Sequence, residues 1–245
     1  MASFLAISLL GFVLGMRHAT DPDHVIAVST IVSKQRGVGK AGLIGVLWGL
    51  GHTFTIFVVG AAIILFGVAI PARLGLSMEL AVGVMLILLG VLNLTGVLQA
   101  AMARLTPDSI APVDKDVNVP APISSHDQES CSIGAIQLLR PLAVGIVHGL
   151  AGSAAVALLV MTAIRDPWHE IGYLLVFGIG TVVGMMLITA LIAIPFVYTA
   201  QRLSGWNRSM AVASGLLSVC FGCFISYQIG IVGGLFGSHP HWSPR

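Results

Sequence analysis

The chain has 245 residues, of which 56% are hydrophobic and only 9% are charged, and its mean hydropathy is +0.97. Long apolar runs of this kind exclude a water-soluble globular domain and indicate a membrane protein with several spans. The net charge of +2 gives no support for nucleic-acid binding, so no nucleic-acid partner is expected. Three cysteines are too few for a disulfide framework, and the fold is expected not to depend on one.

Six apolar segments are long enough to cross a bilayer, which requires about 20 apolar residues per helix. They cover residues 2–33, 41–70, 78–104, 140–164, 169–200 and 208–237. We therefore expect an all-α, multi-pass membrane protein with six transmembrane helices in the cell (inner) membrane.

The first apolar segment contains a group of charged and ionisable residues between Arg17 and His24. Pro22 cannot continue a regular helix without losing a backbone hydrogen bond, and Asp21 before it is typical of a helix N-cap. One half-helix is expected to end near His18 and a second to begin near Pro22. Irregular backbone at membrane depth is tolerated only where it faces protein or a water-filled cavity, so the break predicts a site.

The break gathers four side chains that suit a divalent metal ion, namely His18, Asp21, Asp23 and His24. Ionisable groups inside a membrane are costly and usually mark an ion or substrate pathway. Imidazole nitrogen and carboxylate oxygen are ligands for borderline divalent transition metals. The alternative, in which these groups only pair with Arg17 and the backbone, is less favoured because so many ionisable groups cost too much for structure alone.

The second apolar segment contains His52 well inside the span, directly after Gly51. A single intramembrane histidine is often a hydrogen-bonded core residue, and that interpretation stays open. The glycines near His52 would let this helix approach the first one closely, which would bring His52 to the same site.

Residues 105–139 form a long polar segment and are expected to be a solvated loop that joins two halves, residues 1–104 and 140–245. Metal binding within this loop is the weaker alternative, and it would use His126, Asp127, Glu129 and Cys131. Basic residues are more numerous in the loops that face the cytoplasm when the N-terminus is outside. This distribution favours an orientation with both termini outside.

The second half contributes one more candidate ligand and a cysteine pair. His148 lies in the fourth apolar segment beside Gly149, although no acidic residue accompanies it. Cys220 and Cys223 form a C-x-x-C pair in the last segment. Such a pair matters in soluble redox proteins, but small residues at a helix interface are the favoured interpretation here.

Similar motifs recur in the two halves at a nearly constant offset, which suggests an internal repeat. The matches pair residues 15–18 with 145–148 at an offset of 130, residues 48–52 with 177–181 at 129, and Gly83 and Gly90 with Gly215 and Gly222 at 132. Three spans per half is an odd number, so the two three-helix repeats are expected to be inverted. Inverted repeats are typical of transporters, whose site lies near the midplane at the repeat interface.

The stretch from His18 to His24 resembles the H-x4-D-H signature of the nickel/cobalt transporter family. The Leu-Gly-His-Thr sequence at residues 50–53 resembles the second signature of that family, L-G-H-S/T. The six-span length and residues 148–153 resemble its shorter members, the UreH-type permeases associated with urease. The chain departs from the family at Pro22, where alanine is typical.

The resemblance implies a metal site and a cellular context. It implies that His18, Asp23 and His24 bind the metal, with Asp21 and His52 in support. It also implies a functional link to nickel enzymes such as urease. Larger members carry an acidic segment in the second half, and the corresponding residues 147–155 contain no acid.

These observations predict a secondary transporter, or permease, that moves Ni²⁺ or Co²⁺ through an intramembrane His/Asp site. The ion is the transported substrate, no prosthetic group is expected, and the chain is not expected to be an enzyme. A membrane metalloenzyme is disfavoured, because the sequence has no H-E-x-x-H motif and no glutamate in the span interiors. A thiol-redox carrier or non-metal exporter that uses the cysteine pair stays open, and so does a homo-oligomer.

Overall fold

The computed structural model describes residues 2–33, 35, 37–66, 71–105, 139–150, 167–202, 204–237 and 240–241. All regular structure within these residues is helical, so the all-α prediction is confirmed for the described part. The helices are α1 (Ala2–His18), α2 (Pro22–Val32), α3 (Val38–Phe66), α4 (Ala72–Leu105), α7 (Pro167–Arg202), α8 (Ser204–Tyr227) and the π-helix η2 (Gln228–Val232). A further helical segment covers residues 139–149.

Within the described residues, four apolar stretches are long enough to cross a membrane, namely Val38–Phe66, Ala72–Gly96, Trp168–Ala200 and Trp206–Val232. The helices α1 and α2 are apolar but shorter, with 17 and 11 residues. Each falls below the length of about 20 residues that one crossing requires. Large hydrophobic side chains such as Leu9, Phe54 and Leu191 are exposed on the outside of the bundle, which suits contact with lipid. The chain is therefore an integral membrane protein.

Several helix ends differ from the predicted segments, and two of the differences exceed four residues. The helix α4 begins at Ala72, immediately after Pro71, and not at residue 78. The prediction that the last helix reaches residue 237 is wrong, because the π-helix ends at Val232 and Gly234 adopts a φ of 70°. This left-handed conformation favours glycine and ends a helix. Residues 67–70 and 151–164 of the predicted apolar segments, and residues 106–138 of the predicted loop, lie outside the described residues.

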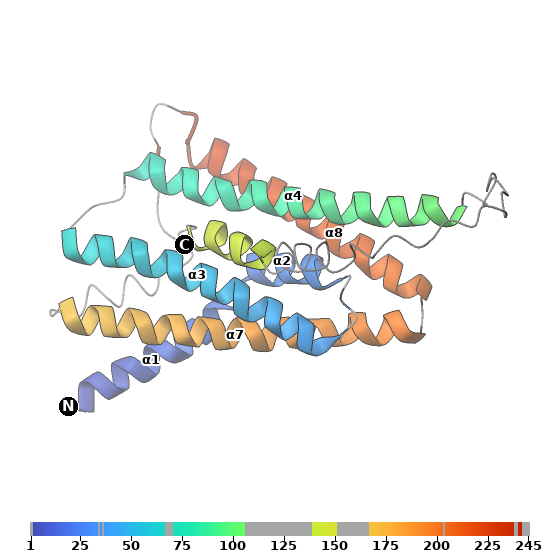
Figure 1. The fold of residues 1–245 in the computed structure, drawn as a ribbon. Helices are drawn as coiled ribbons and strands as arrows, with labels where there is room; N and C mark the ends of the chain where they lie inside the picture. The colour runs from blue at the N-terminus through green and yellow to red at the C-terminus, as the bar shows by residue number, and fades with distance from the viewer. Residues whose placement is uncertain are drawn as a thin grey trace, which may run out of the picture.

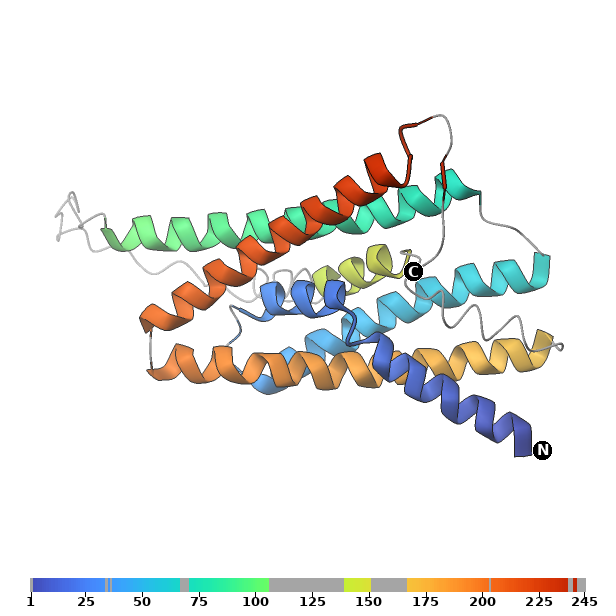
Figure 2. The ribbon, with the colours of Figure 1, turned by 180° about the vertical axis from the view of Figure 1, so that it is seen from behind.

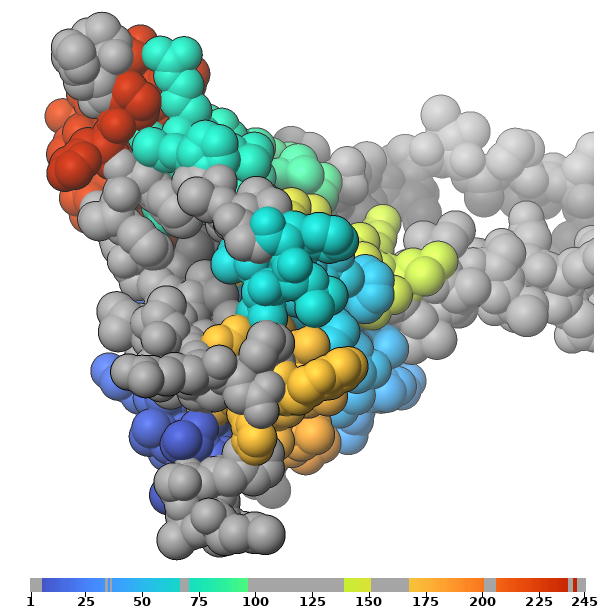
Figure 3. All heavy atoms as spheres, turned by 90° about the vertical axis from the view of Figure 1, so that its left-hand side faces the viewer, coloured from blue at the N-terminus to red at the C-terminus, as the bar shows by residue number. Residues whose placement is uncertain are grey.

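The helices form two groups with a buried layer between them. Both α1 and α3 pack along α7, whereas α4 packs along α8. The two ribbon views place these groups on opposite sides, with α2 and the helical residues 139–149 between them (Figures 1 and 2). Seen from the end, the tips of α4 and α8 lie together above those of α3, α7 and α1 (Figure 3).

The short helix α2 is part of the core of the protein. It contacts α4, α7 and α8, and it contributes four side chains to the main hydrophobic core, namely Ile26, Ala27, Val28 and Val32. Because its apolar surface is covered by protein, α2 can carry polar residues at one end and still be stable inside the membrane.

Polar contacts attach the far end of α2 to α4 and α8. Thr30 Oγ1 donates a hydrogen bond to the carbonyl oxygen of Ser214 at 3.2 Å. Ser33 Oγ donates to Asn93 Oδ1 at 3.4 Å, and Asn93 Nδ2 donates to the carbonyl oxygen of Ala211 at 2.9 Å. Interhelical hydrogen bonds in membranes contribute on the order of 1 kcal/mol each, so this network holds α2 in place.

Glycines let the helix backbones touch where the two halves cross. A Cβ atom on Gly15 would meet the carbonyl oxygen of Phe177, and a Cβ atom on Gly145 would meet that of Trp48. Gly15 and Gly145 are 130 residues apart, and Trp48 and Phe177 are 129 residues apart. In the first contact the glycine comes from residues 1–104 and the carbonyl from residues 140–245. In the second contact the glycine comes from residues 140–245 and the carbonyl from residues 1–104.

The helices α4 and α8 also make two matching contacts, and each helix supplies the glycine Cβ position in one contact and the carbonyl in the other. A Cβ atom on Gly90 would lie 2.6 Å from the carbonyl oxygen of Gly215, and one on Gly222 would lie 2.6 Å from that of Gly83. The four glycines are the ones that the sequence comparison of the halves pairs at an offset of 132. Small residues therefore set the helix spacing at corresponding crossings.

Replacing Gly15 or Gly145 by leucine is expected to destabilise the protein, because the side chain would collide with a backbone carbonyl that cannot move away cheaply. Overpacking a core typically costs about 1–3 kcal/mol. Thermal unfolding of the purified protein in detergent measures the loss. Gly39→Leu is the matched control, since nothing lies within 4 Å of its Cβ position. Equal stability of all three variants would contradict the close backbone contacts.

Candidate metal centre

The first apolar segment breaks where the sequence predicts. The backbone N–H of Thr20 donates to the carbonyl oxygen of Arg17 at 2.9 Å, and that of Asp21 donates to His18 at 3.1 Å. These bonds close the last turn of α1 before Pro22, which has no N–H and begins α2. The predicted break between His18 and Pro22 is confirmed, and it brings the end of one helix next to the start of another.

Asp21 occupies the N-cap position of α2, but its side chain does not cap the helix. Its Oδ2 atom lies 2.8 Å from Nδ1 of His18 instead. Asp23 takes over part of the cap, because its Oδ1 accepts a hydrogen bond from the backbone N–H of His24 at 3.0 Å. The predicted N-cap carboxylate thus orients an imidazole of the preceding helix.

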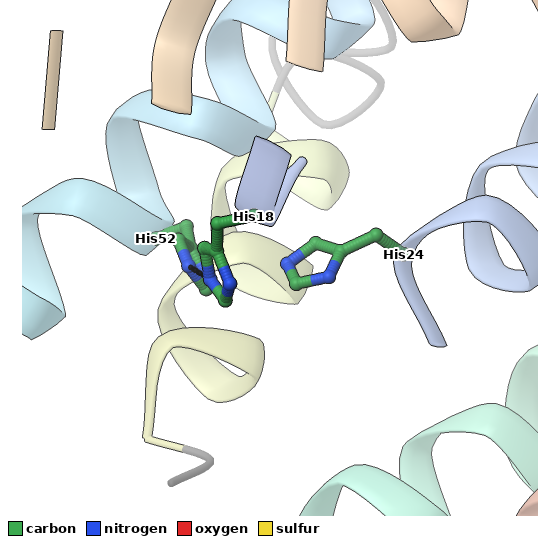
Figure 4. Close-up of side chains that lie close together, drawn as sticks. All are labelled: His18, His24 and His52. Atoms are coloured by element: carbon green, nitrogen blue, oxygen red, sulfur yellow. Dashed lines mark hydrogen bonds between the residues drawn. The ribbon is translucent and has the colours of Figure 1, made fainter. Parts of the chain in front are cut away.

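Four histidines from four helical segments meet at the break. His18 is the last residue of α1, His24 lies in the first turn of α2, His52 lies in α3, and His148 lies in the helical residues 139–149. All four are buried, three of them completely. The ring centroids of His24 and His148 are 4.2 Å apart, and those of His24 and His52 are 5.0 Å apart. Figure 4 shows His18, His24 and His52 converging on one place.

Two aromatic side chains that the sequence analysis did not assign to the site flank the imidazoles. Trp48 stacks on His24 at a centroid distance of 5.9 Å and meets His148 edge-on at 5.5 Å. Phe177 lies 5.7 Å from His18. The signal that could have found them was the repeat, because Trp48 and Phe177 occupy matching positions in the two halves.

Asp23 determines which nitrogen atoms of two histidines remain free. Its Oδ1 lies 3.1 Å from Nδ1 of His24, and its Oδ2 lies 3.0 Å from Nε2 of His148. A carboxylate can only accept, so both ring nitrogens donate their hydrogen to Asp23. Nε2 of His24 and Nδ1 of His148 are then unprotonated, and both are buried without a hydrogen-bond partner among the described residues.

His18 and His52 face each other through their Nε2 atoms, which are 2.9 Å apart. Because Nδ1 of His18 donates to Asp21, its Nε2 is the unprotonated atom of the neutral ring. In the absence of an ion, His52 donates to it and leaves its own buried Nδ1 without a partner in the described structure. Zinc binds imidazole nitrogens at roughly 2.0–2.1 Å. Two nitrogens that bind one ion at that distance, with an angle of about 90° at the ion, lie about as far apart as these two Nε2 atoms.

The donor atoms form two overlapping sets. One set consists of His18, His24 and His52, and the other consists of Asp23, His24 and His148. The donor atoms within each set lie within 4.8 Å of one another. Imidazole and carboxylate groups that lie this close together are suited to a divalent transition metal, because imidazole is a ligand that such ions prefer.

The structure brings five of the six predicted site residues into one cluster and leaves Asp21 at its edge. The side chain of Asp21 is 39% exposed, against 16% for that of Asp23. The expected approach of His52 to the first segment is observed. The candidate loop ligands in residues 126–131 lie outside the described residues. Cys220 and Cys223 are exposed on α8 with free thiols.

A comparison with curated proteins finds a clear relative. The urease accessory protein UreH of Bacillus sp. (strain TB-90) is 38% identical over 235 residues, which cover 95% of this chain and 95% of that protein. The chain belongs to the UreH-type branch of the nickel/cobalt transporter family. The relative is an accessory protein of an enzyme and not an enzyme itself, so the prediction that this UreH-type chain is not an enzyme is confirmed.

A second relative is more distant. The chloroplast protein FOR GROWTH AND FERTILITY 1 of Arabidopsis thaliana is 24% identical over 224 residues, which cover 90% of this chain but 59% of that protein. No family model matches the UreH-type chain, and no solved structure matches it.

The hydrogen bonds of Asp23 predict the tautomers of the metal-free protein. Nitrogen-15 NMR of labelled histidines is expected to show hydrogen on Nδ1 of His24 and on Nε2 of His148. Asp23→Asn replaces one of the two acceptor oxygens by a donor, so at least one of these rings should change its tautomer. Asp21→Asn should affect His18 and, through the contact between their Nε2 atoms, His52, but neither His24 nor His148. Unchanged His24 and His148 signals in Asp23→Asn would contradict the bridging role.

Proposed function

We propose that this UreH-type protein is a secondary transporter, or permease, that carries Ni²⁺, and also Co²⁺, across the cell membrane. The observation that carries the proposal is the buried group of four imidazoles and one carboxylate at a broken helix. Imidazole nitrogen suits nickel and its neighbours, whereas Mg²⁺ prefers oxygen ligands in an octahedral arrangement and keeps several waters. The ion is the cargo of the protein and not a resident cofactor.

The donor groups have the surroundings that metal ligands usually have. A metal-binding histidine commonly donates its other ring N–H to a carboxylate, which fixes its orientation and raises its basicity. His18 does so to Asp21, and both His24 and His148 do so to Asp23. We assign the four histidines and Asp23 to direct metal binding and Asp21 to the support of His18.

The name of the Bacillus relative connects that protein to urease. We propose that the present protein likewise supplies nickel to a nickel enzyme such as urease. A metal permease and the enzyme that uses the metal need no direct contact, because the ion itself links them. The proposed partners are therefore the divalent ion and the lipid bilayer.

We propose that residues 1–104 and 140–245 form two inverted three-helix repeats joined by residues 105–139. The support comes from the glycine contacts that occur twice with the halves exchanged, at α1 and α7 and again at α3 and residues 139–149. Inverted repeats place the substrate site at the repeat interface, which agrees with a cluster that joins three histidines of residues 1–104 to His148. The distribution of basic residues supports an orientation with both termini outside.

A thiol-redox or non-metal exporter has less support than a metal permease. Cys220 and Cys223 are exposed on α8. The buried donor cluster lies on α1, α2, α3 and residues 139–149, and none of its members comes from α8.

Replacing His18, His24 or Asp23 by alanine is expected to abolish Ni²⁺ uptake by vesicles that contain the purified protein. The uptake rate should fall by more than the roughly 10–100-fold that is typical when a residue that hydrogen-bonds to a metal ligand is replaced. His52→Asn should weaken uptake or shift the preference among Ni²⁺, Co²⁺, Zn²⁺ and Mn²⁺. His169→Ala, at the exposed start of α7, is the control that should transport normally. Normal uptake by His24→Ala would refute direct binding.

Reporters fused to the two ends of the chain test the inverted arrangement. Two odd-numbered repeats of opposite orientation return the chain to the side on which it began. An N-terminal and a C-terminal reporter should therefore be labelled from the same, outer side of intact cells. Labelling of the two reporters from opposite sides would rule out six spans in two inverted halves.

A further inference from the structure

His24 belongs to both sets of donor atoms at the site. It completes the set with His18 and His52, and it also completes the set with Asp23 and His148. A neutral imidazole has one unprotonated ring nitrogen. His24 can therefore bind one ion at a time, and the two positions that the sets define cannot both be filled with all of their ligands.

The two positions differ in which half of the chain supplies the remaining ligands. His18 and His52 both come from residues 1–104. The other position has ligands from both halves, because Nε2 of His148 in the second half lies 3.0 Å from Oδ2 of Asp23 in the first. His18 and His148 also occupy matching places in the two halves, 130 residues apart. Each position thus contains one of two equivalent histidines, with His24 shared between them.

The two positions also differ in their chemistry. The position at His18 and His52 offers nitrogen donors only, which favours nickel and its neighbours over Mg²⁺. The position at Asp23 and His148 adds a carboxylate oxygen, and each oxygen of Asp23 has a second lone pair beyond the hydrogen bond it accepts. An ion that exchanges His18 and His52 for Asp23 and His148 keeps His24 throughout, so it is never without a protein ligand.

We propose that the transported ion occupies these two positions in turn, with His24 as the common ligand and His148 as a ligand of the second position. The proposal rests on the proposed function of a divalent-metal permease and adds a step within the same site. The proposal predicts that a variant can lose transport and retain binding. A chain with only one complete position should still bind an ion but should not transport it.

The test measures Ni²⁺ binding to purified protein in detergent by titration calorimetry, and Ni²⁺ uptake into vesicles, for the same variants. The wild type should bind one ion per chain. His148→Gln retains a donor for Asp23 but has no imidazole nitrogen, and it should bind one ion with nearly unchanged affinity while uptake falls by more than about 100-fold. His24→Ala should lose both binding and uptake, and His169→Gln should lose neither.

Visible spectra of bound Co²⁺ identify the ligands of each position. His148→Gln should retain a spectrum of nitrogen ligands, whereas His52→Gln should bind Co²⁺ with a different spectrum that includes the carboxylate. Two ions per wild-type chain, normal uptake by His148→Gln, or loss of binding in His148→Gln would each overturn the two-position proposal. Absence of Ni²⁺ uptake by the wild type would instead overturn the proposed function on which it rests.

Discussion

The hydrogen bonds of Asp23 link the parts of this protein that sequence distance separates. One carboxylate accepts from His24, its neighbour in α2, and from His148, which lies 125 residues further along the chain. A largely buried carboxylate inside a membrane needs polar partners, because little water is available to solvate it. The pairing therefore attaches the start of α2 to the second half of the protein, while the far end of α2 is attached to α4 and α8.

Close backbone contacts make this arrangement possible. Imidazoles on four helical segments can touch only if the helices approach more closely than large side chains permit. Gly51, which precedes His52, faces the carbonyl oxygen of Leu142, and Gly149, which follows His148, faces that of His52. The glycines beside these histidines are thus the reason that the rings meet. Polar pairing and small residues act together, since neither would bring the donors together alone.

Local features of the site were predictable from the sequence, and long-range contacts were not. Pro22 determines the break by its own chemistry, so the positions of His18 and His24 followed from it. The contact between His18 and His52 depends on helix packing over 34 residues, which spacing alone does not reveal. Asp21 takes the predicted N-cap position, but its side chain pairs with His18, because an N-cap and an imidazole compete for the same carboxylate. The end of the last helix depends on a π-helix, whose occurrence apolar composition does not predict.

The shortness of the two half-helices has an electrical consequence. At about 1.5 Å per residue, α1 and α2 measure roughly 26 Å and 16 Å, so neither alone spans a hydrocarbon core of about 30 Å. In the proposed permease their junction lies within the membrane, and an ion bound there has passed through only part of the transmembrane voltage. A divalent ion that crosses half of a 100 mV potential changes its free energy by about 2.3 kcal/mol. In the proposed permease, the resting voltage of the cell would therefore act separately on the arrival of the ion and on its departure.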